Sequence, residues 1–385
     1  MSLLNRKINH YRFPWRDNNA FRLLTDGNIF FPAMLEAINR AQHQILVEMY
    51  LIESGKTAHQ FIDALIKQSE KNINVFLLLD DFGARGLHKH DRQKIEHSNI
   101  QLSFFNPLRY GKFRRNLFRD HRKLLVVDDQ VAFTGGTGIT DDFNTAYKTT
   151  SGWHEVMIEI QGPVIADWQT LFFENWNRWV KNKTGYSVNE ISDTGQQSGR
   201  VTSTGGVTRT EIKRSFLKRI RQAERRVWMA TAYFVPSWKL IRALKQAARN
   251  GCDVRLLLPG RHTDHPAIRH AGRRYYSHLL RNGVRIFEYQ PRFLHAKVLL
   301  CDQWVSIGSS NIDRWNLRWN LEANQEVDDQ SFAHDVTQLF EKDFAHSKEY
   351  IYDKWKYRPW YKRFMEWFWG KIDRWLEKRG QKKGG

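Results

Sequence analysis

The chain has 385 residues, of which 41% are hydrophobic, and its formal net charge is +20 at pH 7. This length and composition allow two domains with cores of ordinary size and exclude an intrinsically disordered chain. The positive charge favours anionic partners, namely nucleic acid, anionic lipid surfaces or phosphorylated substrates, without choosing among them.

The first half of the chain alternates helical and strand patterns. Apolar residues at helical spacing or in short buried runs predict, in chain order, a helix and then a strand within 30–52, a helix near 61–66, a strand over 75–80, a helix over 87–97 and a strand over 100–105. An amphipathic helix over 162–179 closes this half.

The second half repeats the same order. Its predicted elements are a helix over 212–223, a strand over 226–234, a helix over 240–249, a strand over 252–259, a helix over 268–281 and a strand over 284–289. This alternation predicts an α/β protein of two similar lobes, each a mostly parallel sheet flanked by helices.

The domain boundaries follow from composition. Residues 187–206 are polar and rich in Gly, Ser and Thr, which predicts a linker or a mobile loop. We therefore expect a first lobe over 1–186, a second lobe over 207–350 and a basic tail over 351–385.

Both cysteines, Cys252 and Cys301, lie in apolar runs that predict strands, so we expect buried thiols without a disulfide or a metal. Free thiols fit a reducing compartment. No apolar run approaches the ~20 residues that span a bilayer, and the N-terminus lacks the apolar segment of a signal peptide. We expect a cytoplasmic protein whose membrane contacts are peripheral.

One motif, H-x-K-x4-D, occurs in both halves and is followed each time by a Gly-rich turn. Its residues are His121, Lys123 and Asp128 in the first half, and His295, Lys297 and Asp302 in the second. Residues two apart in a strand face the same side, so each copy presents one imidazole and one ammonium together. One histidine on a strand more often has a structural role. Packing, however, gives no reason for a His-x-Lys pair to recur at the matching place in the second half.

Two such pairs brought face to face suit a phosphodiester. The lysines stabilise charge on the phosphoryl oxygens, one histidine attacks phosphorus, and the other protonates the leaving alkoxide. We find no cluster of carboxylates or cysteines suited to a metal and expect no cofactor.

The chain resembles the phospholipase D superfamily, whose signature is H-x-K-x4-D followed by G-S-x-N. More narrowly, it resembles the bacterial cardiolipin synthases in their short form without N-terminal membrane helices. The narrower resemblance is carried by RDHRKLLVVDD, WHEVMIEIQGPV (153–164), YYSHLLRNGVRIFEY (275–289), LHAKVLLCD and GSSNIDRWNLRWNLEANQE (308–326).

The resemblance implies roles by position. His121 is the expected nucleophile and His295 the general acid and base, although the likeness of the lobes leaves the reverse open. The resemblance also implies that Asn311, within the Gly308–Asn311 turn that holds Ser309, contacts the phosphate.

Two further assignments each concern a pair of carboxylates. Glu155 and Glu322 match the acids that orient the histidines, since an imidazole needs a partner to set its tautomer. Asp128 and Asp302 belong to the catalytic motif, while their place at a turn fits a hydrogen-bonding role equally well.

The first copy departs from the family pattern. Gly136 stands where Ser is usual and Gly138 where Asn is usual. We therefore expect an asymmetric site in which the second copy holds the phosphate more completely.

Two basic segments point to the substrate. The cluster ahead of the first motif, formed by Arg109, Lys112, Arg114, Arg115 and Arg119, is either a solvated loop or a funnel for an anionic head group. The tail combines an apolar, Trp-rich stripe with Lys and Arg, which predicts a helix in a membrane interface.

Three functions remain open at this point. A phosphatidyltransferase would pass a phosphatidyl group to phosphatidylglycerol at the cytoplasmic face of the bacterial membrane. A phospholipase D or nuclease would use water, and nucleic acid stays open as a less favoured partner. Two intact His–Lys pairs argue against a non-catalytic lipid-binding protein.

Overall fold

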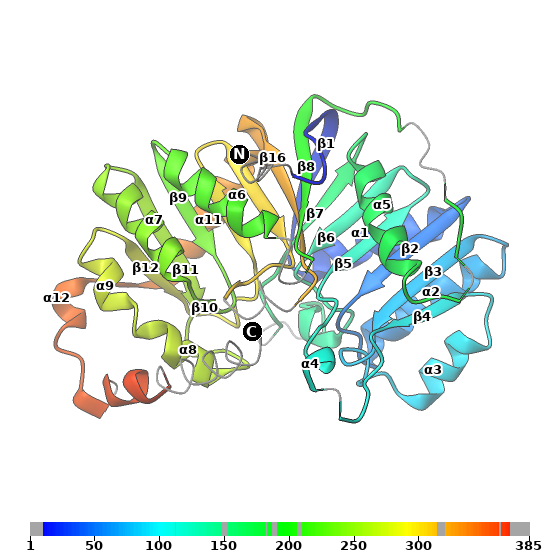
Figure 1. Ribbon diagram of the computed structural model, residues 1–385, viewed down its shortest axis with the longest axis horizontal. Coiled ribbons are helices and arrows are strands. Elements are labelled where there is room, and N and C mark those ends of the chain that lie inside the picture. The colour runs from blue at the N-terminus through cyan, green and yellow to red at the C-terminus, as the bar shows by residue number, and fades with distance from the viewer. Residues whose placement is uncertain are drawn as a thin grey trace, which may run out of the picture.

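The computed structural model describes residues 11–111, 113–147, 152–181, 183–186, 191–205, 210–313, 320–361 and 363–369. Two lobes lie side by side and share one sheet of 15 strands in the order β17-β12-β11-β9-β13-β14-β16-β8-β1-β7-β6-β5-β2-β3-β4 (Figure 1). The described residues therefore form one continuous sheet in which each lobe supplies one half.

The first lobe follows the predicted order with added strands. Its elements are β1 (Arg16–Thr25), α1 (Gly27–Arg40), β2 (Gln44–Met49), α2 (Lys56–Ser69), β3 (Asn74–Asp80), α3 (Lys89–Glu96), β4 (Gln101–Phe105), α4 (Phe113–Asn116), β5 (Lys123–Val127), β6 (Val131–Gly135), the 3-10 turn Asp141–Phe143, β7 (Val156–Gln161) and α5 (Ile165–Trp176). The sequence patterns did not reveal β1, β6 or β7.

The second lobe repeats this arrangement. Its elements are β8 (Gln197–Ser203), α6 (Glu211–Gln222), β9 (Arg226–Ala230), β10 (Phe234–Val235), α7 (Trp238–Arg249), β11 (Asp253–Pro259), α8 (Pro266–Arg273), α9 (Tyr276–Leu280), β12 (Arg285–Tyr289), β13 (Val298–Cys301), β14 (Trp304–Gly308), β15 (Ile312–Asp313), β16 (Ala323–Asp328), α11 (Gln330–Ala345), β17 (Ser347–Tyr350) and α12 (Tyr352–Trp355). The helix predicted over 268–281 is two helices.

The prediction of mostly parallel sheets was wrong. In the large sheet, parallel pairs join only β2, β3 and β4 in one lobe and β9, β11 and β12 in the other, where the edge strand β17 is antiparallel to β12. Each H-x-K strand instead pairs antiparallel with both of its neighbours. The cause is that short turns join β5 to β6 and β13 to β14, and a turn of this length reverses the chain direction.

The predicted linker was also wrong in part. Residues 187–190 and 206 lie outside the described residues, but Gln197–Ser203 form β8 in the middle of the sheet. β8 pairs with β16 of the second lobe and with β1 of the first, and β1 pairs in turn with β7. Polar residues misled the prediction because the sheet ladder satisfies the backbone whatever the side chains are.

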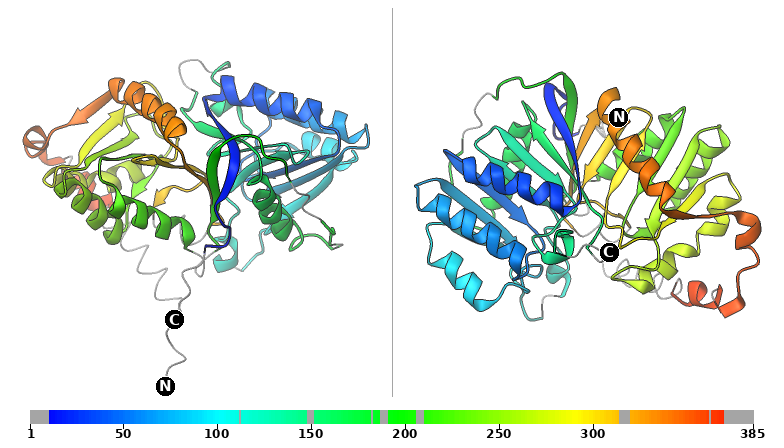
Figure 2. Two further views of the ribbon diagram at one scale, coloured as in Figure 1. Left: turned by 90° about the horizontal axis from the view of Figure 1, so that it is seen from above. Right: turned by 180° about the vertical axis from the view of Figure 1, so that it is seen from behind.

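Helices cover both faces of the sheet (Figure 2). Helices α5 and α11 lie over one face of the twisted sheet, whereas α1, α2, α6 and α7 cover the other. One core lies under α5 and α11 and continues across the junction of the lobes, and two further cores lie under α1 and α2 and under α6 and α7. The sheet is thus buried on both faces, as the apolar strand runs predicted.

Two smaller predictions concern the cysteines and the membrane. Cys252 and Cys301 are both buried free thiols, as predicted. Within the described ranges, no helix combines the length and apolar character needed to cross a bilayer.

Candidate active site

The two H-x-K motifs meet at the junction of the lobes. His121 precedes β5 and donates its backbone N–H to the Leu321 carbonyl of the second lobe at 2.9 Å. His295 precedes β13 and donates in the same way to the His154 carbonyl of the first lobe at 2.8 Å. Each catalytic segment is therefore bonded to the segment that leads into a central strand of the opposite lobe.

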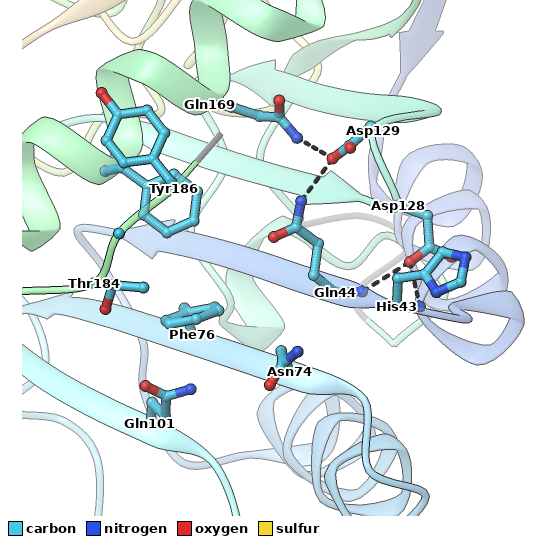
Figure 3. A pocket seen from close by; sticks show the side chains of 12 residues that line it. His43, Gln44, Asn74, Phe76, Gln101, Asp128, Asp129, Gln169, Thr184 and Tyr186 are labelled. Carbon is cyan, nitrogen blue, oxygen red and sulfur yellow. Dashed lines mark hydrogen bonds between the residues drawn. The ribbon is translucent and has the colours of Figure 1, made fainter. Parts of the chain in front are cut away.

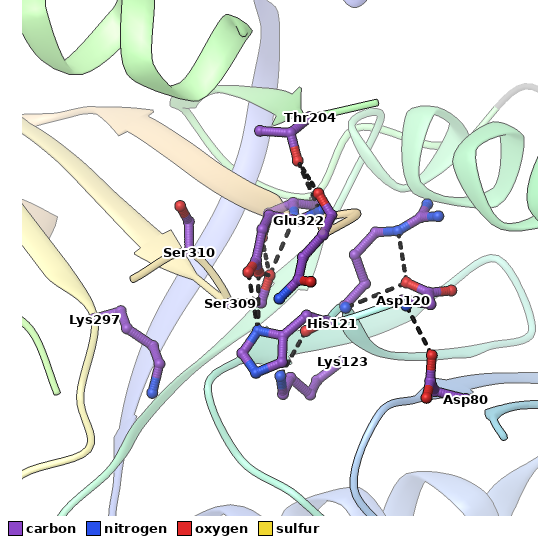
Figure 4. Close-up of polar contacts among 12 residues, drawn as sticks. Asp80, Asp120, His121, Lys123, Thr204, Lys297, Ser309, Ser310 and Glu322 are labelled. Carbon is purple, nitrogen blue, oxygen red and sulfur yellow. Dashed lines mark hydrogen bonds and ion pairs between the residues drawn. The ribbon is translucent and has the colours of Figure 1, made fainter. Parts of the chain in front are cut away.

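The carboxylate that holds His121 comes from the second lobe. His121 Nδ1 lies 3.0 and 3.1 Å from the two carboxylate oxygens of Glu322, which directly precedes β16 (Figure 4). The Ser309 hydroxyl donates to the same carboxylate in a very short hydrogen bond. The Tyr50 ring packs edge-on against the imidazole with 4.7 Å between centroids. These contacts fix the ring and leave Nε2 as the nitrogen available for reaction.

The second histidine is held by a carboxylate of the first lobe. His295 Nδ1 lies 2.5 Å from Glu155 Oε2, and Lys297 Nζ lies 3.4 Å from the same oxygen. Aromatic rings surround this imidazole, with centroids 5.2 Å away at Phe143 and 5.1 Å away at Trp153. The sequence patterns did not reveal these rings, because they come from loops that carry no periodicity.

All four basic side chains of the motifs share one small volume. Lys123 Nζ donates to the His121 carbonyl at 2.5 Å, and Figure 4 shows the Lys297 side chain across from His121 and Lys123. Burial and the two neighbouring ammonium groups lower the pKa values of His121 and His295 well below the usual value. Burial lowers the pKa of Lys123 to about 7 and also lowers that of Lys297. An anion placed among these groups would raise all four pKa values, so the site is built to receive negative charge.

Each H-x-K motif and the turn that follows it form one half-site. The two half-sites are unequal, as the Gly residues of the first copy predicted. Asn311 is completely buried, and neither its amide oxygen nor its amide nitrogen has a hydrogen-bond partner within the described structure. At Gly138 of the first copy, a Cβ atom would lie 2.9 Å from both the Cβ and the carbonyl oxygen of Leu51, so no Asn fits there. At Gly136, a Cβ would lie 2.3 Å from Glu155 Oε2. Gly138 thus leaves room for Leu51, and Gly136 leaves room for the Glu155 carboxylate.

The supports beneath the half-sites also differ. Asp120 and Arg122 flank the first histidine and form an ion pair of 3.1 Å, and Asp80 accepts the backbone N–H of Asp120 at 2.9 Å. Burial raises the pKa of Asp80 to about 6. Leu294 and Ala296 occupy the corresponding positions beside the second histidine. One half-site therefore rests on buried charges and the other on apolar side chains.

The basic cluster ahead of His121 is only partly available as a funnel. Arg119 is turned inward, where its guanidinium pairs with Asp80 at 3.3 Å. Arg109 is exposed. Lys112 and the side chain of Arg114 lie outside the described part of the chain. Arg119 therefore serves the fold, and the funnel interpretation was wrong for this residue.

The catalytic assignment of Asp128 and Asp302 was wrong. Both lie at the far end of their strands with positive φ, 52° and 54°. The Asp128 carboxylate accepts backbone N–H groups of residues 42–44 at 2.6–2.9 Å, and the Asp302 carboxylate accepts those of residues 224–226 at 2.9–3.0 Å. Each aspartate ties the end of an H-x-K hairpin to the start of the neighbouring strand.

Figure 3 shows Asp128 beside a surface hollow of about 500 Å³, lined also by Gln44, Phe76, Gln169 and Tyr186. This hollow opens at the opposite edge of the sheet from the His–Lys pairs. It is therefore no part of the site formed by the motifs.

A buried histidine that the sequence analysis did not single out links the lobes next to Glu155. His154 Nδ1 lies 2.8 Å from Asp26 Oδ1 of the first lobe, and Nε2 lies 2.9 Å from Asp343 Oδ2 on α11 of the second. Arg292 also pairs with Asp26. Only a doubly protonated ring donates to both carboxylates. In accord with this, the two carboxylates outweigh burial and raise the pKa of His154 to about 9.

Two His–Lys pairs that face each other across a two-lobed sheet define a phosphodiester-transfer protein of the phospholipase D type. The solved structure of phosphatidylserine synthase from Haemophilus influenzae has the same fold, with a TM-score of 0.73 over 94% of this chain and 96% of that chain at 14% sequence identity.

The sequence comparisons are narrower. A family model described as "Cardiolipin synthase, PLD-like domain" matches residues 34–176 and 216–344. Cardiolipin synthase B of Salmonella typhimurium is 33% identical over 83% of this chain and 78% of its own length. Cardiolipin synthase A of Pseudomonas entomophila is 34% identical over 88% of this chain and 71% of its own. The chain belongs to the family of phospholipase D-like cardiolipin synthases.

The first prediction concerns the two motif aspartates. Asp128→Ala and Asp302→Ala should each lower the free energy of unfolding by about 2 kcal/mol, because three backbone N–H groups lose a charged acceptor. Turnover per folded molecule should stay within a few-fold of the unmodified protein. Urea denaturation and activity of the same samples check both points. A thousandfold loss of turnover with unchanged stability would restore the catalytic assignment.

The second prediction concerns pH. The folded-state pKa of His154 is raised from 6.5 to about 9, so its contribution to stability is complete below pH 6.5 and is lost as the pH rises through 9. A shift of this size corresponds to about 3 kcal/mol. Unfolding of the unmodified protein and of His154→Gln, measured from pH 6 to 10.5, should give a difference in stability that shrinks at alkaline pH. A difference independent of pH would contradict the ion-pair assignment.

Proposed function

We propose that this protein is a cardiolipin synthase-type phosphatidyltransferase that passes a phosphatidyl group to phosphatidylglycerol through a phosphohistidine. The observation that carries the proposal is the crossed pairing, in which each catalytic histidine is oriented through Nδ1 by a glutamate of the other lobe. This arrangement turns the two lobes into one catalytic unit. Membership of the cardiolipin synthase family supports phosphatidylglycerol as the acceptor.

The first chemical step forms the covalent intermediate. His121 Nε2 attacks phosphorus, the bond from phosphorus to the leaving alkoxide breaks, and His295 Nε2 gives that alkoxide a proton. Lys123 and Lys297 stabilise the negative charge that builds up on the phosphoryl oxygens. Glu322 stabilises the positive charge that His121 gains on forming the P–N bond.

The second step uses the same groups in reverse. His295 takes a proton from the acceptor hydroxyl, the acceptor oxygen bonds to phosphorus, and the P–N bond to His121 breaks. When phosphatidylglycerol is the acceptor the product is cardiolipin, and when water enters the product is phosphatidic acid. The chemistry of the histidines is the same for both outcomes.

The position of the second-copy turn supports His121 as the nucleophile. The Ser309 hydroxyl and His121 Nδ1 both contact the Glu322 carboxylate. The buried Asn311 amide follows Ser309 by two residues on the same turn. A phosphate bound by this turn would lie next to His121. The apolar rings around His295 suit the alcohol that leaves and the alcohol that enters. This arrangement assigns phosphorus to one half-site and the exchanged alcohol to the other.

The tail supports work at a lipid surface. Residues 360–361 and 363–369 are helical, and their aromatic side chains are largely exposed, with 77% for Trp360, 52% for Phe364 and 55% for Trp367. Glu366 on the same helix is buried and pairs with Arg358 at 2.8 Å, which holds the helix to the body of the protein. The rest of the predicted amphipathic stripe, from 370 onward, lies outside the described residues.

Exposed aromatic rings next to basic residues are typical of a helix that rests in the head-group region of an anionic bilayer. These rings support a peripheral contact with the membrane, and we propose that the contact is on the cytoplasmic face of the bacterial membrane.

The third prediction tests the chemistry. Replacement of either histidine, His121→Ala or His295→Ala, should lower turnover by at least a thousandfold, because each step needs both imidazoles. Vesicles of phosphatidylglycerol and lipid analysis provide the assay, with cardiolipin and glycerol as the expected products. With a soluble phosphodiester whose leaving group needs no proton, such as a p-nitrophenyl ester, His295→Ala should accumulate a phosphohistidine at His121, detected after an alkaline quench because the P–N bond is labile to acid.

Near-normal activity of either variant would contradict the two-histidine mechanism. Phosphatidic acid as the sole product would assign hydrolysis in place of transfer. Cleavage of nucleic acid with no lipid product would assign a nuclease.

The fourth prediction tests the tail. The triple variant Trp360→Ser, Phe364→Ser, Trp367→Ser should reduce co-flotation with anionic vesicles by at least tenfold, because three exposed rings no longer enter the interface. Turnover of a soluble short-chain phosphodiester should fall far less. Ile29→Ser, which changes an apolar residue that is 49% exposed on α1, is the matched control. Equal flotation of the triple variant and the control would remove the tail from the membrane contact.

A further inference from the structure

A tyrosine and an aspartate of the second lobe lie beside His295. Tyr233 follows β9, and its ring meets the His295 ring edge-on with 6.4 Å between centroids. Its hydroxyl donates a very short hydrogen bond to Oδ2 of Asp264, which lies in the loop between β11 and α8. Neither residue belongs to the H-x-K motifs or to the turns that follow them.

Asp264 differs from the carboxylates that hold the histidines. The side chains of Glu155 and Glu322 are fully buried, whereas 25% of the Asp264 side chain is exposed. Its negative charge acts on both His295 and Lys297, where it partly offsets the burial that lowers the pKa of each. Asp264 is thus a solvent-accessible carboxylate whose field reaches the general acid and base.

A carboxylate in this place opposes the binding of an anionic phosphodiester, because like charges repel in a site of low dielectric constant. A carboxylate accepts about four hydrogen bonds, and the Tyr233 hydroxyl takes one position. His265 Nε2 lies 3.7 Å from Asp264 Oδ2, too far for a good hydrogen bond. Acceptor capacity therefore remains on the Asp264 carboxylate.

We propose that Asp264, oriented by Tyr233, selects a glycerol head group as the acceptor by receiving a hydrogen bond from the hydroxyl that does not react. This inference rests on the proposed function, which places both the leaving and the incoming alcohol at His295. The glycerol head of phosphatidylglycerol carries two hydroxyl groups, so one is free to bind Asp264 while the other reacts.

The proton balance of the transfer step is unchanged. The reacting hydroxyl gives its proton to His295 Nε2 and its oxygen bonds to phosphorus as the P–N bond to His121 breaks. In this proposal Asp264 accepts a hydrogen bond without taking the proton. Its role is to position the acceptor, and water, which has no second hydroxyl, gains nothing from it.

The test is a competition between soluble acceptors. Phosphatidylglycerol vesicles are incubated with equal concentrations of 1,2-propanediol, 1-propanol and ethanolamine, and the phosphatidyl products are quantified. Product ratios do not depend on how much of the enzyme is active. The unmodified enzyme should favour the diol over the mono-alcohol, and Asp264→Asn should lower this preference about tenfold, as expected for loss of one hydrogen bond to a charged group.

Two further variants complete the test. Tyr233→Phe keeps the ring and removes the hydroxyl that orients Asp264, so it should lower the preference in the same direction, and it serves if Asp264→Asn does not fold. Asp335→Asn, which changes an exposed aspartate on α11, should leave the ratio unchanged.

An unchanged diol preference in both Asp264→Asn and Tyr233→Phe would overturn the inference, as would a product mixture dominated by ethanolamine. Phosphatidic acid as the sole product of the unmodified enzyme, with neither cardiolipin nor an alcohol product, would instead overturn the proposed transferase function, whereas cardiolipin formed without any diol product would overturn the inference alone.

Discussion

The active site depends on one interaction made twice, the hydrogen bond from a histidine of one lobe to a glutamate of the other. Neither lobe can orient its own imidazole. His121 needs Glu322, and His295 needs Glu155. The relative placement of the lobes must therefore hold to within the tolerance of a hydrogen bond, a few tenths of an ångström. A loose linker between two independent domains would not meet this requirement.

The fold meets it with a continuous sheet. β8 and β1 fill the space between the lobes, so that paired strands connect β16 to β7, with a register shift where β8 meets β1. The buried ring of His154 adds an ionic link between Asp26 and Asp343 directly beside Glu155. Such a group is costly to bury, and pairing on both nitrogens offsets that cost. The central strands and the His154 ion pairs both act where the two H-x-K segments meet.

Symmetry of the chain repeat does not extend to the chemistry. The first half-site rests on the charged pair Asp120–Arg122, and the second is enclosed by Phe143 and Trp153. A polar environment with a buried amide nearby suits phosphate, whereas an aromatic enclosure suits the carbon skeleton of an alcohol. The two halves of the duplicated fold thus differ in the surroundings of their histidines, which is the basis for proposing unequal roles for them.

The sequence by itself determined the α/β class, the internal repeat and the four His and Lys residues, because strand periodicity and the spacing of a motif are local properties. It also placed Glu155 and Glu322 near the histidines through the family resemblance. Only the tertiary structure decided which glutamate serves which histidine, that Gln197–Ser203 form a central strand, and that Asp128 and Asp302 bind backbone at the far edge. These outcomes depend on pairings between residues far apart in the chain, where the partner and not the local pattern sets the role.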